Sequence, residues 1–315
     1  MLTSRVLVTS LIGTIVVGCH RPMSGEDHSS HNVSTAGAPA GPSSAALPAS
    51  NGAAAARLAA SPRRGEWIKI PFEAGSKDTI MAWVVYPSNA RAKAPVVVVV
   101  HDINGLSAWA RGVADQAAAE GFIAVSPDFA SRSRGAPSTA ELPRDSANKL
   151  VSPLPSSERN QIISALANHL MALPAAEHRY GVIGYCWGGG TVFMHAVNGG
   201  VKGYSGGVAF YGLPYLNGPV PIVDSLKKIN APVMLFNGSK DARISAAMPV
   251  LDSSMKALGK NYVGTNYDGA SHGFMRSQDD PKATRDLAEE AANLAATKDA
   301  WPRTVAFLKR NLGVR

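Results

Sequence analysis

The segment Gly184-Tyr185-Cys186-Trp187-Gly188-Gly189-Gly190 constrains the fold of this chain more than any other. It follows an apolar run that ends at Ile183, and a helix-like stretch from Thr191 to Val197 comes after it. A strand that turns sharply into a helix needs strained backbone angles and close approach of neighbouring chain, which glycine tolerates. Such a turn would expose the Cys186 sulfur at the positive end of a helix, where a thiolate is favoured. The spacing Gly-x-Cys-x-Gly therefore predicts a nucleophile at Cys186. A buried structural cysteine beside a glycine-rich loop is the alternative.

The first residues of the chain are typical of an export signal. Arg5 supplies positive charge ahead of a short apolar run, Val6 to Val17, which is too short for an ordinary membrane-spanning helix. The run ends in Val16-Val17-Gly18-Cys19, which resembles the lipobox of bacterial lipoprotein signals. We therefore expect residues 1–19 to be a lipoprotein-type signal peptide and Cys19 to be the site of lipidation. An ordinary secretory signal and an uncleaved anchor are the alternatives.

Residues 20–65 are rich in Ala, Ser, Gly and Pro and contain few large apolar residues. Such a composition cannot bury enough surface to offset the entropy of an ordered chain, so it predicts a disordered tether. A tether of this length would let a lipid-anchored domain at residues 66–315 clear a membrane surface. We expect an exported, membrane-anchored lipoprotein of the bacterial cell envelope, facing the periplasm or the outside.

The number of cysteines and the net charge limit the functions that this chain can have. The chain has two cysteines, so Cys186 has no disulfide partner if Cys19 carries a lipid. A lone thiol in an exported domain points to catalysis. The net charge of +8 is spread thinly, and no basic run with interleaved aromatic residues supports nucleic-acid binding. His28 and His31 lack the spacing of metal ligands, and we expect no metal site.

Strands alternate with helices along residues 66–315, which predicts a mostly parallel sheet covered on both faces. Expected strands are 66–71, 80–86, 94–101, 122–127, 180–183, 208–211, 232–237 and 261–267. Expected helices are 106–120, 158–173, 191–197, 245–258 and stretches within 281–311. Residues 132–155 contain many Ser and Pro residues and are expected to form a long loop near a site.

A cysteine nucleophile needs a base, and the base needs a group that orients it. Asp241 follows the expected strand 232–237, and His272 follows the next strand, which gives the order nucleophile, acid, histidine. His195, in the helix after the elbow, stands at a packing position. A capping role for Asp241 and a plain loop position for His272 are the alternatives.

Backbone N–H groups are expected to bind the oxyanion of the reaction. Trp187 is the residue after the nucleophile, and Ile103 lies just beyond the expected strand 94–101. The backbone N–H groups of these two residues form the predicted oxyanion hole. The Trp187 ring either lines the pocket or packs in the core. Gly203 to Gly207 also match Gly-x-Ser-x-Gly, but Ser205 precedes its strand and lacks the strand–turn–helix context.

Between Glu66 and Arg315 the chain resembles the dienelactone hydrolase family. Several separated segments carry the resemblance: the elbow at 184–189, His101-Asp102-Ile103-Asn104-Gly105, Gly121-Phe122 with Pro127-Asp128-Phe129, Gly269-Ala270-Ser271-His272-Gly273-Phe274, and Asp241. The resemblance implies an α/β-hydrolase fold and hydrolysis of enol-lactones and related esters through an acyl-cysteine. It implies no metal and no organic cofactor.

The resemblance also implies two arginines that hold a substrate carboxylate. One lies four residues after the histidine, at Arg276, and the other four after the Pro-Asp aspartate, at Arg132, next to Arg134. The planar guanidinium suits this task because it binds a carboxylate through two parallel hydrogen bonds. A surface position is the alternative for Arg276.

Asp102 stands where the family often has a glutamate that hydrogen-bonds the resting thiol and helps to deprotonate it. Aspartate is one methylene shorter. Either the backbone brings Asp102 closer to the thiol, or Cys186 is activated mainly by His272.

Three functions remain compatible with these residues. The first is a cysteine-dependent hydrolase of small esters or lactones, including ones with a carboxylate. The second is a non-catalytic envelope binding protein on the same fold, since a fold alone does not fix a function. The third is a thiol acyltransferase or peptidase, which keeps the triad and changes the acceptor.

Overall fold

The computed structural model describes residues 47–88, 93–135, 137–214, 223–278 and 286–314. The expected signal peptide, the lipidation site Cys19 and most of the expected tether lie outside the described residues. The strands in the described part are β1 (Gly65–Pro71), β2 (Thr79–Val85), β3 (Ala94–Val100), β4 (Ile123–Pro127), β5 (Ala176–Tyr185), β6 (Tyr204–Phe210), β7 (Val233–Gly238) and β8 (Tyr262–Tyr267).

The helices in the described part differ widely in length. They are α1 (Ala54–Ala59), α2 (Ala108–Ala119), α3 (Arg144–Val151), α4 (Ser156–Met171), α5 (Trp187–Val197), α6 (Val223–Leu226), α7 (Ala242–Ala257), α8 (Phe274–Ser277) and α9 (Leu287–Leu312). None of these helices is both long enough and apolar enough to cross a membrane.

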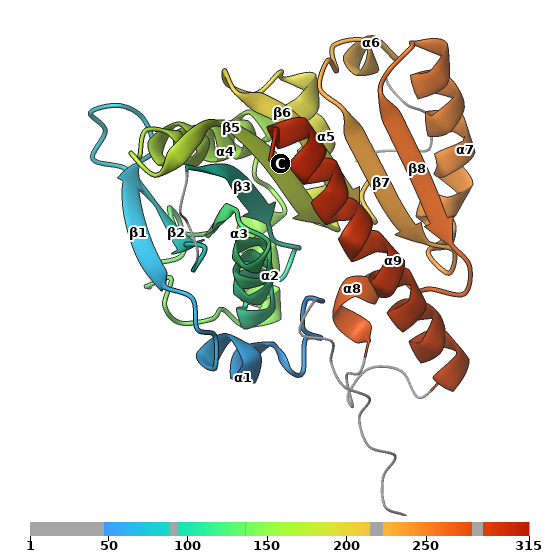
Figure 1. The fold of residues 1–315 in the computed structure, drawn as a ribbon, viewed down its shortest axis with the longest axis horizontal. Coiled ribbons are helices and arrows are strands. Elements are labelled where there is room, and N and C mark those ends of the chain that lie inside the picture. Colours follow the sequence, from blue (N-terminus) through green and yellow to red (C-terminus); the bar gives the residue numbers. More distant parts are fainter. Residues whose placement is uncertain (1–46, 89–92, 136, 215–222, 279–285, 315) are drawn as a thin grey trace, which may run out of the picture. The chain divides into compact units, whose positions relative to one another are not determined.

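The strands form a single eight-stranded sheet in the order β1-β2-β4-β3-β5-β6-β7-β8. β2 is antiparallel to its neighbours β1 and β4, and every other pair is parallel. Parallel neighbours require crossover helices, and these helices cover the faces of the sheet. Figure 1 shows α9 crossing the near face, while α4 and α5 pack on each other and on β5. The predicted class, a mostly parallel sheet between helices, is confirmed.

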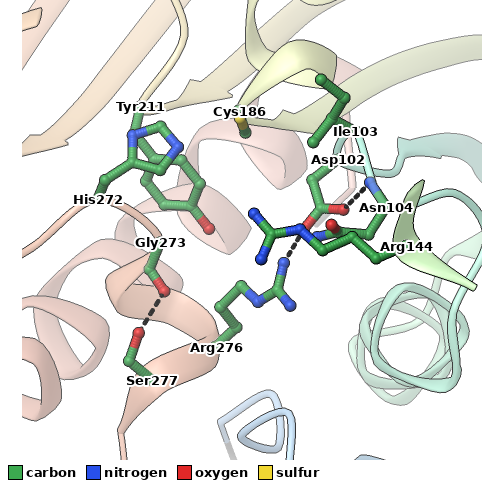
Figure 2. A pocket seen from close by; sticks show the side chains of 10 residues that line it. All are labelled: Asp102, Ile103, Asn104, Arg144, Cys186, Tyr211, His272, Gly273, Arg276 and Ser277. Atoms are coloured by element: carbon green, nitrogen blue, oxygen red, sulfur yellow. Dashed lines mark hydrogen bonds and ion pairs between the residues drawn. The ribbon is translucent and has the colours of Figure 1, made fainter. Parts of the chain in front are cut away.

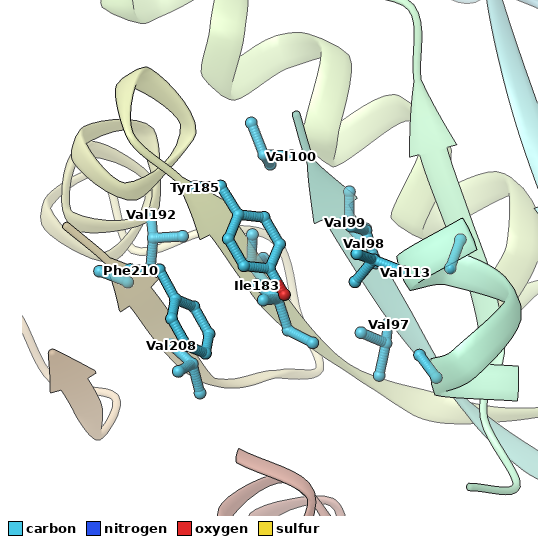
Figure 3. Packing of buried hydrophobic residues seen from close by; sticks show 14 of the residues in the cluster. Val97, Val98, Val99, Val100, Val113, Ile183, Tyr185, Val192, Val208 and Phe210 are labelled. Carbon is cyan, nitrogen blue, oxygen red and sulfur yellow. The ribbon is translucent and has the colours of Figure 1, made fainter. Parts of the chain in front are cut away.

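The centre of the sheet is buried on both faces. All seven residues of β3 are buried, and its valines alternate between the two faces. On neighbouring strands, Tyr185 stacks on Phe210 at 4.8 Å between ring centroids (Figure 3). Each fully buried valine or aromatic side chain contributes roughly 1.5–3 kcal/mol of transfer free energy. This core holds the carboxyl ends of β3, β5, β6 and β7 at fixed positions.

Residues 47–63, which we call the N-terminal strap, pack on the domain. Leu47, Ala49 and Ala54 are buried, and the indole N–H of Trp109 donates to the carbonyl of Ala49 at 3.0 Å. The expectation of a disordered tether up to residue 65 is therefore wrong over 47–65. Alanines bury little surface each, but here they fit against a tryptophan and use backbone hydrogen bonds.

The segment 132–155 is also more regular than expected. Its last part forms α3, which follows Pro143 and buries Ala147 and Val151. The expected long loop therefore ends in a helix. Proline is tolerated at a helix start, and two apolar residues four positions apart give the helix a buried face.

Candidate active site

Cys186 occupies a strained turn between β5 and α5. Its φ is 55° and its ψ is −113°, a conformation that few non-glycine residues adopt. The turn is held because the N–H of Cys186 donates to the carbonyl of Phe210 at 2.9 Å. The predicted strand–turn–helix elbow is therefore present, with the cysteine at its apex.

Glycines let the elbow close. A Cβ atom at Gly188 would lie 2.5 Å from the carbonyl oxygen of Val100 and 2.6 Å from that of His101. A Cβ at Gly184 would collide with the backbone of Gly188 one turn away. Any side chain at these positions would push α5 off the sheet and move the sulfur.

His272 and Asp241 lie at the ends of neighbouring strands and form a pair. His272 Nδ1 is 2.6 Å from Asp241 Oδ2. The other carboxylate oxygen accepts from the N–H of Ile244 at 3.1 Å and so caps α7. Asp241 therefore does both things that its sequence position suggested: it caps a helix and it orients the imidazole.

The charge state of His272 depends on its neighbours. Burial of the ring opposes protonation, but hydrogen bonds and charge from Asp241 and from the Cys186 sulfur outweigh it and raise the pKa of His272 to about 9. Burial likewise opposes ionisation of Asp241, while its bonds to His272 and Ile244 lower its pKa overall. Asp241 and the Cys186 sulfur thus both favour the protonated form of His272.

The expected oxyanion donors both belong to residues near Cys186. Trp187 is the first residue of α5, so its N–H has no acceptor within the helix. Ile103 lines the same pocket as Cys186. The Trp187 ring is not part of the pocket wall; it stacks on His101 and packs edge-on against Phe129.

A pocket of about 220 Å³ lies in front of Cys186 (Figure 2). Its lining residues come from the ends of strands and from α3 and α8: Asp102, Ile103, Asn104, Arg144, Cys186, Tyr211, His272, Gly273, Arg276 and Ser277. The lining contains two arginines and one histidine but one carboxylate. This balance of charge suits the pocket to an anionic small molecule. In the described residues, no group of His, Cys, Asp or Glu side chains is arranged to hold a metal ion.

Asp102 does not bind the thiol. Its Oδ2 forms an ion pair with Arg276 Nη1, and its Oδ1 accepts from the N–H of Asn104 at 2.8 Å. The expected contact between Asp102 and Cys186 is therefore absent among the hydrogen bonds of the described residues. Both carboxylate oxygens are already used, which leaves His272 as the titratable partner of Cys186 in the pocket.

Arg276 lies in the pocket as expected, but Arg132 does not. The Arg132 guanidinium binds Asp78 and Glu158, each at 2.5 Å, and stacks on Phe72. Two carboxylates and a ring outside the pocket hold this side chain, so its expected role in substrate binding is wrong. Arg134 is no substitute, since it is buried in an ion pair with Asp128.

Sequence reasoning missed several pocket residues, among them two with side chains that can bind a substrate. Arg144, the first residue of α3, lines the pocket with Arg276 (Figure 2). Pro143 in the sequence favours a helix that begins at the next residue, which is Arg144. Tyr211 has a φ of 39°, and its ring lies 4.9 Å from that of His272. Nothing local in the sequence marks Tyr211, because its conformation depends on contacts with other strands.

Ser205 behaves as a structural residue. It lies in β6, and its hydroxyl donates to the carbonyl of Gly203 at 2.9 Å. His195 is buried in α5 and bonds the hydroxyl of Tyr180 at 2.8 Å. Neither side chain is part of the pocket wall.

The sheet order, the elbow and the His272–Asp241 pair define an α/β-hydrolase. The model of the dienelactone hydrolase family matches residues 80–312, which is most of the chain. The chain belongs to this family, and it is a hydrolase.

Relatives agree with this assignment. An Escherichia coli K12 protein, provisionally named a carboxymethylenebutenolidase, is 24% identical over 238 residues, covering 74% of this chain and 83% of that protein. A Bradyrhizobium protein, provisionally named a 2-oxo-3-(5-oxofuran-2-ylidene)propanoate lactonase, is 24% identical over 257 residues, or 78% and 94% of the two chains. Among solved structures, a provisionally named dienelactone hydrolase from Klebsiella pneumoniae superposes with a TM-score of 0.63 at 22% identity, covering 80% of this chain and 100% of that one. The last similarity supports the fold alone.

Proposed function

We propose that this protein hydrolyses carboxylic esters or lactones through an acyl-cysteine formed on Cys186. The observation that carries the proposal is that Cys186 and His272 line the same pocket, with a 2.6 Å hydrogen bond between His272 and Asp241. A nucleophile, a base and an orienting carboxylate in this order are the parts that acyl transfer requires.

The steps follow from the positions of these groups. Cys186 passes its thiol proton to His272, whose raised pKa favours the protonated form, and the thiolate attacks the carbonyl carbon. The oxygen takes up the negative charge near the N–H groups of Trp187 and Ile103. His272 then donates the same proton to the departing oxygen as the bond between that oxygen and the acyl carbon breaks. Water attacks the thioester with His272 as the base, the C–S bond breaks, and the sulfur takes the proton back as the carboxylate product leaves.

The arginines favour substrates that carry a carboxylate. Arg144 and Arg276 line the pocket, and the Asp102 carboxylate already occupies one guanidinium nitrogen of Arg276. A substrate carboxylate would bind the remaining donors of these arginines, as the names of the lactonase and carboxymethylenebutenolidase relatives suggest. Tyr211 adds a buried hydroxyl without a partner in the described residues.

We also propose where in the cell the protein acts. The lipobox-like segment that ends at Cys19 supports export and lipid anchoring at a bacterial cell envelope. Labelling cells with a radioactive or alkyne fatty acid, in the full chain and in Cys19→Ser, tests this. Equal labelling of both proteins would contradict the anchor.

Hydrolysis of p-nitrophenyl esters and enol-lactones, with and without a free carboxylate, tests the activity. The wild type should turn over both classes, and Cys186→Ala should turn over neither. Equal rates in the two proteins would remove the cysteine mechanism. Turnover of no ester, with Cys186 alkylated as slowly as a free cysteine, would favour a binding protein. Transfer of the acyl group to an added amine or alcohol would favour an acyltransferase.

A further inference from the structure

Arg159, in the first turn of α4, is a buried cation that pairs with no carboxylate in the part of the chain that the structure describes. Only 2% of the surface of this residue is exposed to solvent. Nη1 donates to the hydroxyl of Thr191 at 3.0 Å, and Nη2 donates to the sulfur of Met194 at 2.9 Å. Of the ion pairs formed by the described residues, none includes Arg159, and the adjacent Glu158 binds Arg132 instead.

Such an arrangement is costly. A buried charge loses its hydration, and no acid in the described residues compensates Arg159. Burial lowers the pKa of this guanidinium to about 10, which leaves it charged at neutral pH. A leucine or methionine would fill the same space at lower cost, so stability alone does not account for an arginine here.

The fold places this charge at the edge of the sheet where the candidate nucleophile lies. α4 leads directly into β5, so its first turn lies toward the carboxyl ends of the parallel strands, where α5 begins. The Arg159 guanidinium carbon is 5.0 Å from the centroid of the Trp187 ring. The cation therefore packs against the residue that follows Cys186.

Hydrogen bonds connect the same groups. The hydroxyl of Thr191 receives its bond from Arg159 and donates to the carbonyl of Trp187 at 3.1 Å. This bond fixes the first turn of α5. A cation at the positive end of a helix is unfavourable for the helix but favourable for an anion located there.

We propose that Arg159 is a positioning residue that holds the first turn of α5 and adds positive charge behind Cys186, so that sulfur and oxyanion carry negative charge more readily. The inference rests on the proposed role of Cys186 as nucleophile. It assigns a function to a side chain that touches neither the pocket nor the reacting atoms.

Alkylation of Cys186 by iodoacetamide tests this inference without relying on ester hydrolysis. Cys19→Ser in the full chain leaves Cys186 as the single thiol. Arg159→Gln should alkylate about tenfold more slowly at pH 7 and should need about one pH unit more for the same rate, as expected for removing one nearby charge. Arg159→Lys, which keeps the charge, should restore most of the rate.

A second pair of variants keeps Arg159 in place. Met194→Glu puts a carboxylate beside Nη2 and neutralises the cation, whereas Met194→Gln has the same shape without charge. Met194→Glu should alkylate as slowly as Arg159→Gln, and Met194→Gln should stay close to the wild type.

Thermal melting and circular dichroism separate this effect from misfolding. If Met194→Glu or Arg159→Gln is folded and alkylates at the wild-type rate, the inference is overturned. If Arg159→Gln does not fold, the Met194 pair decides. A protein that shows the predicted alkylation rates but hydrolyses no ester would overturn the proposed activity and leave the role of Arg159 intact.

Discussion

The two sides of the pocket are built in different ways. The nucleophile side consists of Cys186 and His272, with Asp241 bonded behind His272, and all three lie in segments that follow strands of the parallel sheet. The arginine side consists of Asp102, Arg144 and Arg276, and two of these residues stand on the short helices α3 and α8. The buried sheet fixes the nucleophile side, whereas contacts between loops and short helices fix the arginine side.

This difference suggests a division of roles, in which one side of the pocket holds the reacting groups and the other side binds the substrate. Strand ends in a close-packed sheet hold reacting groups rigidly, which acyl transfer requires. The arginine side also depends on the N-terminal strap, because the N–H of Asn51 donates to the carbonyl of Arg276 at 2.9 Å. A segment before the matched family region, which begins at residue 80, thus supports a residue proposed to bind substrate.

The largest effect is expected from Asp241→Asn on the nucleophile side. Asparagine also caps helices, so α7 should remain stable. The imidazole loses its negative partner, and kcat should fall about 10³–10⁴-fold. Steady-state hydrolysis of a p-nitrophenyl ester and a thermal melt measure both properties. A kcat within tenfold of the wild type, at unchanged stability, would remove Asp241 from the mechanism.

A smaller effect is expected from Arg144→Ala on the arginine side. The KM for a carboxylate-bearing ester should rise about tenfold to a hundredfold, the value of one or two charge-assisted hydrogen bonds. A neutral ester should be unaffected. Arg132→Ala is the matched control, because that guanidinium binds Asp78 and Glu158 away from the pocket. Equal effects of the two substitutions would contradict the distinction between these arginines.

The sequence predicted the nucleophile side far better than the arginine side. Glycines around Cys186 and the positions of Asp241 and His272 after strands are local signals, and they were sufficient to predict the sheet and the strand ends at which these three residues lie. The sequence did not predict the position of the Arg132 side chain, because its partners Asp78 and Glu158 are distant in sequence. The prediction for the strap was wrong because tertiary contacts with α2 and α8 order its alanines.

The pH dependence of stability tests the charge on the nucleophile side. The pKa of His272 is raised from 6.5 to about 9 in the folded protein, so the folded state binds this proton more tightly. The stabilisation is present in full below about pH 6.5 and is lost as the pH rises through about 9. The difference in melting temperature between the wild type and His272→Gln should therefore shrink from pH 6 to pH 10. A difference that stays constant over this range would show that the proton on His272 contributes no stability.

The smallest effect is expected where the strap meets the arginine side. Trp109→Phe removes the indole N–H that binds the carbonyl of Ala49 but keeps a ring near Arg276. Loss of one buried hydrogen bond should lower the free energy of unfolding by about 1 kcal/mol and raise the KM for a carboxylate-bearing ester a few-fold.

Trp83→Phe is the control for that substitution, because the indole N–H of Trp83 has no hydrogen-bond partner among the described residues. If both substitutions change stability and KM equally, the strap does not support the arginine side. If only Trp109→Phe raises KM, while kcat for a neutral ester is unchanged, recognition extends to residues that precede the family region and leaves the chemistry at Cys186 untouched.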